Sequence, residues 1–281
     1  MPPRITVAGS VNLDLVAFCD RLPRPGETLT DAELDRVPGG KGANQAVAAA
    51  KLGADVRFVG CVGNDEHGRL ALSGLEEAGV DVRGVAVVDE PTGVALVVVA
   101  AGGENQIVVA PGANRRLRPG DFELGDVDAV LCQLEIPVET VGWAAERADA
   151  MFCLNAAPAR TVPVETLARC DVIVANSFEL DALGSSPLGC LFALTLGPEG
   201  ALLLEGGDEI ARATPPSVVP VDGTAAGDAF CSCLVVSLLE ERPREEALRR
   251  ACAAGAIAAS RPGAQPSLPT AAEVDEILAA A

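Results

Sequence analysis

Short apolar segments alternate with longer alanine-rich segments along most of the chain, and this alternation limits the possible folds more than any other feature. The strand-like segments are Ile5–Ala8, Val56–Val62, Val94–Ala101, Ala129–Leu134, Met151–Leu154, Val172–Ala175, Leu191–Leu196 and Ala201–Glu205. The helical segments are Gln45–Leu52, Gly68–Ala78, Val138–Ala148, Asp228–Glu240 and Arg244–Ala259. Such alternation predicts βαβ units, in which helices cover both faces of a mostly parallel sheet. We therefore expect an α/β protein built as a three-layer sandwich.

Two segments interrupt this alternation. Arg21–Pro38 is polar, contains prolines and lacks helical periodicity, and Val85–Pro111 reads as consecutive strands around a glycine-containing turn. Two β-rich insertions in an α/β chain can pair into a small separate sheet that covers a cleft. We expect a single domain spanning residues 1–281, with a lid formed by the segments at about 12–38 and 90–112.

Composition and charge exclude several classes of protein. Apolar residues make up 49% of the chain and charged residues 22%, which excludes a disordered or fibrous protein. The net charge of −19 disfavours nucleic acid and anionic membranes as partners. The longest apolar run, Val94–Ala101, is far shorter than the ~20 residues of a membrane span. No apolar segment of the kind found in signal peptides precedes the first polar motif, so we expect a cytoplasmic protein.

Cysteine and histidine usage argues against zinc or redox chemistry. The nine cysteines include no CxxC pair, and most of them lie among apolar residues, as expected of small core residues. The single histidine argues against zinc sites and against His-based catalytic triads.

A polar motif follows the first strand-like segment. Asn12 and Asp14 lie two residues apart, so in an extended chain their side chains point to the same face. An amide together with a carboxylate offers the donors and acceptors that suit the hydroxyls of a polyol. A simple turn after a strand is an equally good interpretation of these two residues taken alone.

A glycine-rich motif precedes the first helical segment. It contains Gly39, Gly40, Lys41 and Asn44. Glycines let the backbone approach a ligand closely and expose amides at the start of a helix. The motif matches neither a Walker loop nor GxGxxG. A plain turn is the alternative interpretation.

A third motif precedes the apolar helix near residue 230. The small residues Ala225, Ala226 and Gly227 would leave bare amides at the start of that helix, where an anion or a transferred phosphoryl group can bind. Asp228 lies in the first turn and could accept a proton from an attacking hydroxyl. Capping of the helix by Asp228 is the simpler alternative.

A fourth motif, Arg261–Ser267, follows the last long helical segment. A loop of this kind presents carbonyl and hydroxyl oxygens, which suit a monovalent cation. An ordinary loop that ends the helix is the alternative interpretation.

Taken in order, these motifs resemble the ribokinase family of carbohydrate kinases. The likeness runs from about Ile5 to Pro269 and includes the blocks GSVNLD, GGKGANQAVAAAKLGA, QLEIP, TAAGDAF and GAQPSLP. The resemblance implies a ribokinase-like sandwich with a small β lid, and a homodimer formed through the lids. It implies transfer of a phosphoryl group from ATP to the primary hydroxyl of D-ribose, giving D-ribose 5-phosphate, with Mg²⁺ and K⁺ as cofactors. The partners expected on this basis are the sugar and ATP.

The resemblance also implies a role for each matching residue. The sugar-side residues would be Asn12, Asp14, Gly39, Gly40, Lys41, Asn44 and Glu135. Asp228 would be the base, and the amides of Ala225, Ala226 and Gly227 would form the anion hole. On the nucleotide side would lie Asn176, Thr195, Gly197 and Gly200, with Glu179 near magnesium. Potassium would lie among Asp222, Thr224, Ala258, Gly263 and Ser267.

The chain departs from the family pattern only on the nucleotide side. The segment between Asn176 and Thr195 has room for about one helical turn, where relatives hold a whole helix. Pro198, Gly223 and Cys252 also replace residues typical of the family. The alternatives are a kinase of a related sugar or a nucleoside, and a sugar-binding protein with impaired turnover. A nicotinamide oxidoreductase is disfavoured because no GxGxxG follows the first strand.

Overall fold

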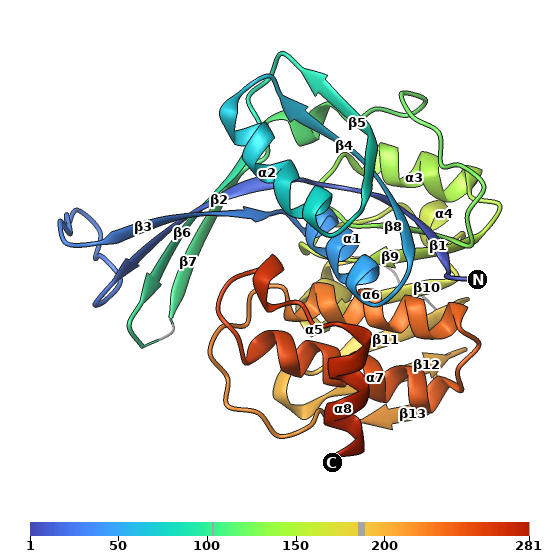
Figure 1. Ribbon diagram of the computed structural model, residues 1–281. Coiled ribbons are helices and arrows are strands. Elements are labelled where there is room, and N and C mark those ends of the chain that lie inside the picture. The colour runs from blue at the N-terminus through green and yellow to red at the C-terminus, as the bar shows by residue number, and fades with distance from the viewer. Residues whose placement is uncertain (103, 185–188, 281) are drawn as a thin grey trace.

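A nine-stranded sheet forms the centre of the molecule. The computed structural model describes residues 1–102, 104–184 and 189–280 (Figure 1). The strands are, in sheet order, β13 (Asp208–Ala213), β12 (Ala201–Glu205), β11 (Leu191–Thr195), β10 (Val172–Asn176), β9 (Met151–Asn155), β8 (Ala129–Cys132), β1 (Arg4–Ala8), β4 (Asp55–Gly63) and β5 (Asp81–Val88). The seven strands from β11 to β5 are parallel to their neighbours, whereas β12 and β13 are antiparallel.

Helices cover both faces of this sheet. They are α1 (Lys41–Lys51), α2 (Glu66–Glu77), α3 (Val138–Arg147), α4 (Val164–Leu167), α5 (Ser177–Ala182), α6 (Ala226–Leu239), α7 (Arg244–Ala259) and α8 (Ala271–Ala279). Side chains of β1 show the two faces: Ile5 and Val7 pack in a core with α1, α2, α6, α7 and α8, whereas Ala8 packs in a second core with α3 and α4. Strands buried on both faces are apolar throughout, as is usual in parallel sheets. The expected three-layer α/β fold is therefore confirmed.

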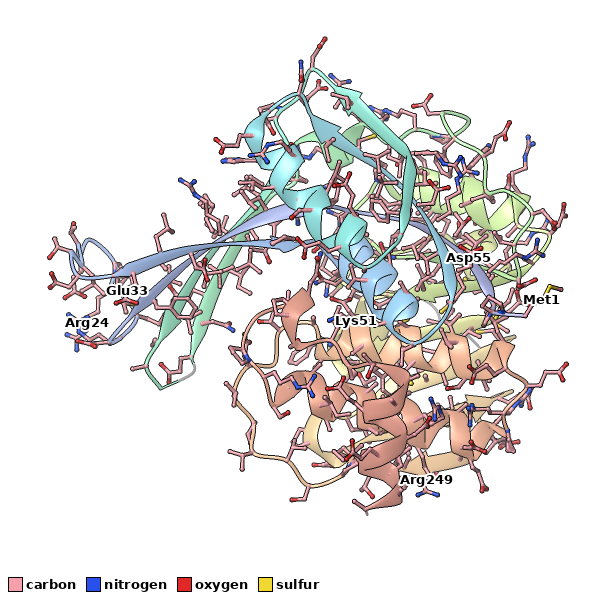
Figure 2. All side chains as sticks on the ribbon, viewed as in Figure 1. Met1, Arg24, Glu33, Lys51, Asp55 and Arg249 are labelled. Carbon is pink, nitrogen blue, oxygen red and sulfur yellow. The ribbon has the colours of Figure 1, made fainter. Side chains whose placement is uncertain are left out.

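A second, smaller sheet extends away from the sandwich (Figure 1). Its order is β3 (Glu33–Gly39), β2 (Asn12–Cys19), β6 (Gly93–Ala100) and β7 (Asn105–Ala110). Arg24 and Glu33 lie near its far end, well away from Lys51 on the main body (Figure 2). The small sheet is built from two insertions in the main sheet: β2 and β3 lie in the chain between β1 and β4, and β6 and β7 lie between β5 and β8.

The segment Val85–Pro111, expected from the sequence to contribute strands to the small sheet, divides between the two sheets. β5, which includes Val85–Val88, forms the edge of the main sheet, whereas β6 and β7 fall within the predicted lid segment at about 90–112. At the edge of the main sheet β5 pairs in parallel with β4, for example Cys61 beside Ala86. The physical reason is that α2 connects β4 to β5 as an ordinary βαβ unit, so this part of the chain contributes strands to the small sheet only from Gly93 onward.

The connection between β10 and β11 is as short as the sequence predicts. It contains the six-residue helix α5, and residues 185–188 of this connection lie outside the described part.

Eight of the nine cysteines are buried. Within the described residues, His, Cys, Asp and Glu side chains form no group of three that could hold a metal ion. No helix in this part of the chain is long and apolar enough to cross a membrane.

Candidate active site

Most of the predicted site residues lie where the parallel strands of the main sheet end. Glu135 follows β8, Asn176 ends β10, Thr195 ends β11, and the helices α1 and α6 begin at the same edge. Ligands of open α/β sheets bind outside the carboxyl ends of the strands. The small sheet reaches this edge through Asn12 and Gly39, which are paired across β2 and β3.

The turn from β3 into α1 depends on glycine. Gly40 caps α1 with φ of 91°, a backbone conformation that side-chain-bearing residues rarely adopt. A Cβ at Gly40 would lie 2.9 Å from the Cα of Val11 and 2.8 Å from the amide nitrogen of Asn12. Glycine therefore lets the start of α1 pack directly against the loop that follows β1, which brings Lys41 and Asn44 to the site.

Glu135 connects this loop to the start of α1. Its Oε2 atom accepts hydrogen bonds from the hydroxyl of Ser10 at 2.5 Å and from the backbone amide of Lys41 at 3.0 Å. A carboxylate at the N-terminus of a helix is also favoured by the helix dipole. Glu135 thus holds three segments together: the loop after β1, the loop after β8 and helix α1.

Two of the predicted sugar-side residues carry a buried acceptor that lacks a protein donor. Within the described residues, Oδ1 of Asp14 and Oδ1 of Asn44 are buried and accept no hydrogen bond. A Cβ at Gly39 would overlap the carboxylate of Asp14, so the glycine leaves room for that group. Burial, together with the negative charges of Glu135 and Asp228, raises the pKa of Asp14 to about 7. A ligand that donates from hydroxyl groups would satisfy both acceptors.

Asp228 is buried beside the same acceptors, with only 4% of its surface exposed. Its Oδ2 accepts from Nδ2 of Asn44 at 3.0 Å, and its Oδ1 accepts from Nε2 of Gln45 at 2.9 Å. Burial raises the pKa of Asp228, while the charge of Lys41 and these two hydrogen bonds oppose the rise. Burial lowers the pKa of Lys41, but the carboxylates of Asp228, Glu135 and Glu179 outweigh it and raise the pKa. The site therefore combines a desolvated carboxylate with a retained positive charge.

The N-terminus of α6 places free backbone amides next to Asp228. Ala225 caps the helix in the left-handed conformation, with φ of 60° and ψ of 3°. In the described part of the chain, the amides of Ala225, Gly227 and Asp228 donate to no protein acceptor, and the amide of Ala226 makes a 3.3 Å bond to the carbonyl of Gly223. Such amides form an anion-binding site. Of the three predicted amides, that of Ala226 is thus already engaged in a local turn.

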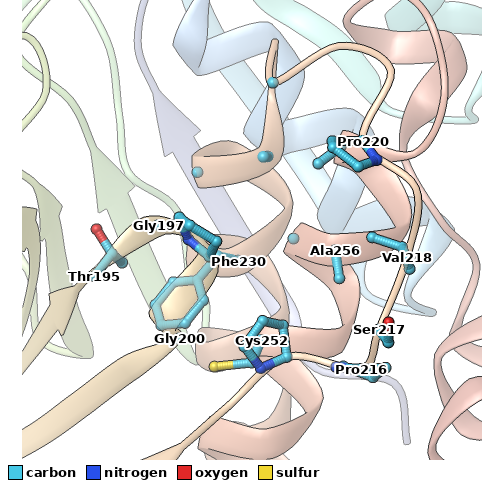
Figure 3. A pocket seen from close by; sticks show the side chains of 17 residues that line it. Thr195, Gly197, Gly200, Pro216, Ser217, Val218, Pro220, Phe230, Cys252 and Ala256 are labelled. Atoms are coloured by element: carbon cyan, nitrogen blue, oxygen red, sulfur yellow. The ribbon is translucent and has the colours of Figure 1, made fainter.

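A cavity of about 680 Å³ adjoins this helix terminus (Figure 3). Thr195, Gly197 and Gly200 line it on one side, and Gly227 lines it where α6 begins. The remaining surface is mostly apolar and includes Pro198, Pro216, Val218, Phe230, Cys252 and Ala256. The cavity therefore brings three of the four predicted nucleotide-side residues to the predicted anion hole.

Asn176 and Glu179 do not line that cavity. They form a capping box at the start of α5: the amide of Asn176 donates to Oε2 of Glu179 at 2.8 Å, and the amide of Glu179 donates to Oδ1 of Asn176 at 2.9 Å. Oε1 of Glu179 takes no part in this box, and the negative charge of Glu179 helps to raise the pKa of Lys41. A carboxylate oxygen in this position suits a divalent cation that is held mainly by phosphates.

Three of the five residues predicted around potassium meet at one carboxylate. Oδ1 of Asp222 accepts from the amide and hydroxyl of Thr224, at 2.9 and 2.6 Å, and Oδ2 accepts from the amide of Gly263 at 2.9 Å. Ser267 is instead engaged locally, since its hydroxyl donates to the carbonyl of Ala264 at 2.7 Å. Ala258 lies near the end of α7, next to Ala259, whose carbonyl accepts from the amide of Asp222 at 3.1 Å. Oδ2 of Asp222 and the carbonyls of these loops are the kind of hard oxygen donors that a monovalent cation requires.

Several polar residues at the site were not identified from the sequence. They are Ser10, Gln45, Asn114, Gln133 and Asn155, all of them buried. Asn114 fixes the side chain of Asn12, because its Nδ2 donates to Oδ1 of Asn12 at 2.7 Å. Ser10, Gln45 and Gln133 lie inside motifs already noted, but only the three-dimensional arrangement shows which partner each of them meets.

Comparison with known proteins gives a consistent result. A family model described as "pfkB family carbohydrate kinase" matches residues 2–271. A ribokinase from Haemophilus influenzae is 37% identical, over 99% of this chain and 99% of that protein. Among solved structures, a ribokinase from Thermotoga maritima is similar with a TM-score of 0.90 and 35% identity, over 99% of both chains. A ribokinase from Arabidopsis thaliana, solved in complex with ribose and ATP, has a TM-score of 0.85 and 31% identity, again over 99% of both chains.

Proposed function

The chain belongs to the pfkB family of carbohydrate kinases and is a kinase of the ribokinase type, and from this premise we propose that it transfers the γ-phosphoryl group of ATP to the primary hydroxyl of D-ribose. The product would be D-ribose 5-phosphate. The observation that carries the proposal is the position of Asp228, which lies between buried acceptors suited to a sugar and free amides at the edge of the 680 Å³ cavity.

The sugar would bind against the start of α1 and the base of the small sheet. Oδ1 of Asp14 and Oδ1 of Asn44 would accept hydrogen bonds from its hydroxyls, because both are buried acceptors that lack a donor within the described residues. Buried unsatisfied acceptors give strong selection for a ligand that supplies the missing donors. Asn12, Gly39, Gly40, Lys41 and Glu135 complete the proposed sugar side.

Asp228 would act as the general base. Its carboxylate lies one hydrogen bond from Asn44, so a hydroxyl bound to Asn44 would be within reach of proton abstraction. A raised pKa makes the carboxylate a better proton acceptor than an ordinary aspartate. The attacking oxygen would then face the amides of Ala225, Ala226 and Gly227.

The amides at the N-terminus of α6 would stabilise the charge on the transferred phosphoryl group. Phosphoryl transfer depends mainly on in-line positioning and on neutralisation of charge, and preorganised amides supply the second. The cavity lined by Thr195, Gly197 and Gly200 would hold the rest of the nucleotide. In this arrangement ATP, the transferred phosphoryl group and the sugar would follow one another along the edge of the sheet where the parallel strands end.

We propose two metal ions as cofactors. Glu179, with Asn176 beside it, would contact Mg²⁺, which when bound to ATP neutralises phosphate charge. The residues fit, because Oε1 of Glu179 lies outside the capping box. K⁺ would lie beside Asp222 and Thr224 and the backbone carbonyls of the loops near Ala258, Gly263 and Ser267. Its proposed effect is to hold the loop before Ala225 in place.

The small sheet is proposed to act as a lid on a single domain and to mediate homodimer formation. Large apolar side chains are exposed on its strands, including Leu34 at 64%, Leu96 at 51% and Val108 at 67%. Exposed apolar surface of this kind favours burial against a second copy. The cytoplasm is proposed as the compartment, because the nine cysteines include no CxxC pair and most of them lie singly among apolar residues.

The proposal is tested by measuring ADP formation from ATP with D-ribose and with a panel of other acceptors: 2-deoxyribose, fructose and nucleosides. We expect D-ribose to give the highest kcat/KM. A higher value with another acceptor would assign the enzyme to that substrate. The absence of turnover with any acceptor, together with a rise in melting temperature on adding ribose, would instead support a sugar-binding protein that lacks catalysis.

A further inference from the structure

A row of buried side-chain amides lies behind Asp228, on the side away from the proposed sugar. Nε2 of Gln45 donates to Oδ1 of Asp228 at 2.9 Å and to Oδ1 of Asn155 at 3.1 Å. Nε2 of Gln133 in turn donates to Oε1 of Gln45 at 2.7 Å. Gln45 and Gln133 are fully buried and Asn155 is 5% exposed. The row therefore runs from Gln133 through Gln45 to the carboxylate.

Only one orientation of the Gln45 amide satisfies these contacts. Both hydrogens of its Nε2 are used, one by Asp228 and one by Asn155, and its Oε1 accepts from Gln133. Turning the amide over would place Oε1 against two oxygens and Nε2 against the amide nitrogen of Gln133. Asn155 is itself fixed, because its Nδ2 donates to the carbonyl of Val174 at 3.3 Å. The arrangement thus points an N–H donor, and not an acceptor oxygen, at Oδ1 of Asp228.

We propose that Gln45 is a positioning residue for Asp228, and that Gln133 and Asn155 act through it by holding its amide in this orientation. The inference deepens the proposed function, since it rests on Asp228 being the base. Asn44 holds Oδ2 on the sugar side, whereas Gln45 holds Oδ1 from the interior, so together they fix the plane of the carboxylate. Gln45 stabilises the ionised form, which burial would otherwise disfavour.

A structural role for Gln45 must be separated from a positioning role. The hydroxyl of Ser232, one turn beyond Asp228 on α6, donates to the backbone carbonyl of Gln45 at 2.9 Å. This bond joins α1 to α6 without touching the carboxylate. Ser232→Ala is therefore a matched control, because it removes a buried hydrogen bond from the same interface and leaves the side-chain amides in place.

The test compares the pH dependence of kcat in the wild type, Gln45→Met, Gln133→Met and Ser232→Ala. Methionine keeps the length of glutamine but cannot donate. We expect the acidic limb of the profile to move up by about one pH unit in Gln45→Met and by less in Gln133→Met. We expect kcat at neutral pH to fall by roughly tenfold or more in Gln45→Met, with KM for ribose changed less than about twofold. Ser232→Ala should lower the melting temperature without moving the acidic limb of the pH profile.

A double variant tests whether Gln133 acts through Gln45. If it does, Gln133→Met added to Gln45→Met should shift the acidic limb no further, so the two effects are not additive. Fully additive shifts would overturn this part of the inference.

A measurement that does not depend on catalysis separates the positioning role of Gln45 from the proposed function. The titration of Asp228 can be followed by ¹³C NMR of protein labelled at the aspartate carboxyl carbons, with Asp228→Asn to assign the signal. An upward shift in either methionine variant supports the positioning role even if no acceptor is phosphorylated, in which case only the proposed function fails. Unchanged titration and unchanged acidic limbs in both methionine variants would overturn the positioning role.

Discussion

Nδ2 of Asn44 lies 3.0 Å from Oδ2 of Asp228, while Oδ1 of the same asparagine is buried and has no protein donor in the described part of the chain. One side chain thus connects the proposed base to the proposed sugar. Asn44 comes from α1, which begins at the small sheet, and Asp228 comes from α6, which begins at the cavity. Binding of the sugar and orientation of the base are therefore coupled through a single amide.

The pKa of Asp14 predicts how ribose binding depends on pH. Burial beside Glu135 and Asp228 raises this pKa to about 7, so Asp14 is increasingly protonated as the pH falls below 7. Sugar hydroxyls donate best to the ionised form, so ribose binding must release the proton at low pH. We expect KM for ribose to rise by roughly tenfold per pH unit well below pH 7. Asp14→Asn should raise KM at neutral pH and flatten this dependence; a KM that stays constant from pH 8 to pH 5 in the wild type would contradict the assignment.

The same raised pKa has a consequence for stability. Between the unfolded value near 4 and the folded value of about 7, the folded protein binds the additional proton. Stability contributed by this group therefore rises as the pH falls through that window and is lost as the pH rises through 7. Chemical denaturation at pH 5.5 and pH 8 should show a smaller difference in the free energy of unfolding for Asp14→Asn than for the wild type. An equal difference in the two proteins would argue that Asp14 titrates normally.

The lining of the 680 Å³ cavity predicts weak discrimination between nucleotides. Among the described residues that line it, Thr195 and Ser217 alone have a polar oxygen or nitrogen in the side chain. A hydrophobic pocket rejects an analogue of similar shape poorly, whereas unpaired buried polar groups reject it strongly. We expect kcat/KM for ATP and GTP to differ by less than about tenfold. Steady-state kinetics with both nucleotides checks this. A ratio of the two kcat/KM values above about a thousandfold would show that polar groups recognise the base by hydrogen bonds.

Ala225 predicts a small gain in stability on substitution by glycine. Its left-handed backbone costs an alanine roughly 1 kcal/mol, which glycine avoids, while glycine loses part of this gain through the entropy of the unfolded chain. We expect Ala225→Gly to change the free energy of unfolding by between 0 and about +1 kcal/mol. Ala225→Val should destabilise the protein and lower kcat, because a β-branched residue resists this conformation at the anion hole. Urea denaturation compares the two variants, and equal stabilities would contradict the expectation.

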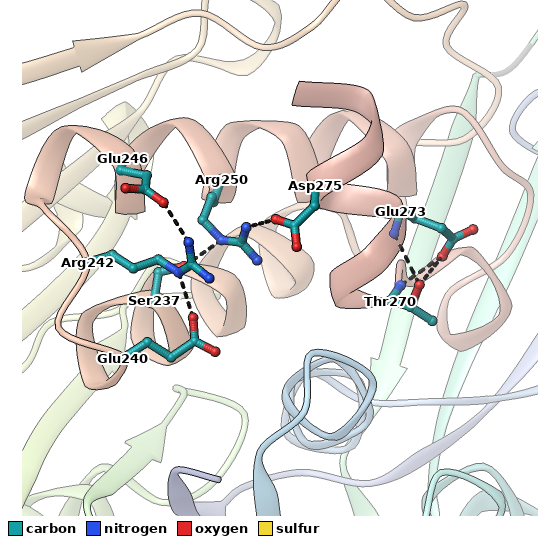
Figure 4. Close-up of polar contacts among 8 residues, drawn as sticks. All are labelled: Ser237, Glu240, Arg242, Glu246, Arg250, Thr270, Glu273 and Asp275. Carbon is teal, nitrogen blue, oxygen red and sulfur yellow. Dashed lines mark hydrogen bonds and ion pairs between the residues drawn. The ribbon is translucent and has the colours of Figure 1, made fainter. Parts of the chain in front are cut away.

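The ion pair between Arg250 and Asp275 predicts an effect on stability alone. Figure 4 shows Arg250 of α7 between Ser237 of α6 and Asp275 of α8. Arg250 is 5% exposed at its side chain and Asp275 is 57% exposed. Asp275→Ala should lower the free energy of unfolding by about 1 kcal/mol, because among the described residues it leaves the buried guanidinium with Ser237 alone as a partner. Solvent already reaches the aspartate, which limits the effect. Thermal denaturation and an activity assay should show a lower melting temperature with unchanged kcat; a change in kcat would show that α8 influences the site.

Much of the architecture follows from patterns that a single sequence carries. Buried parallel strands are apolar on both faces, so Val172–Asn176 and its neighbours are recognisable without any partner. β13 and the assignment of Asp81–Val88 were not predictable in the same way. β13 begins with two charged residues and buries only Ala211 and Ala213 at the edge of the sheet. β5 is distinguished from the small sheet by the helix that precedes it and by its pairing with β4.

The candidate site, too, was only partly predictable from the sequence. Asp14, Lys41 and Asn44 stand in motifs whose composition indicates ligand binding, and the fold brings them to Asp228. Gln45 and Gln133 could not be assigned, because an amide inside a helix or after a strand is ordinary until its partner is known. The capping box of Asn176 and Glu179 is visible in the sequence spacing, but the structure alone shows that it lies outside the cavity.

The measurement that tests the central claim most directly combines turnover and sugar binding in Asp228→Asn. This variant keeps the shape of the side chain and removes the proton acceptor. We predict that ribose-dependent ADP formation falls by at least about a thousandfold, while the dissociation constant for ribose, measured by calorimetry, changes by less than about tenfold. Turnover within tenfold of the wild type, with ribose still bound, would contradict the assignment of Asp228 as the base.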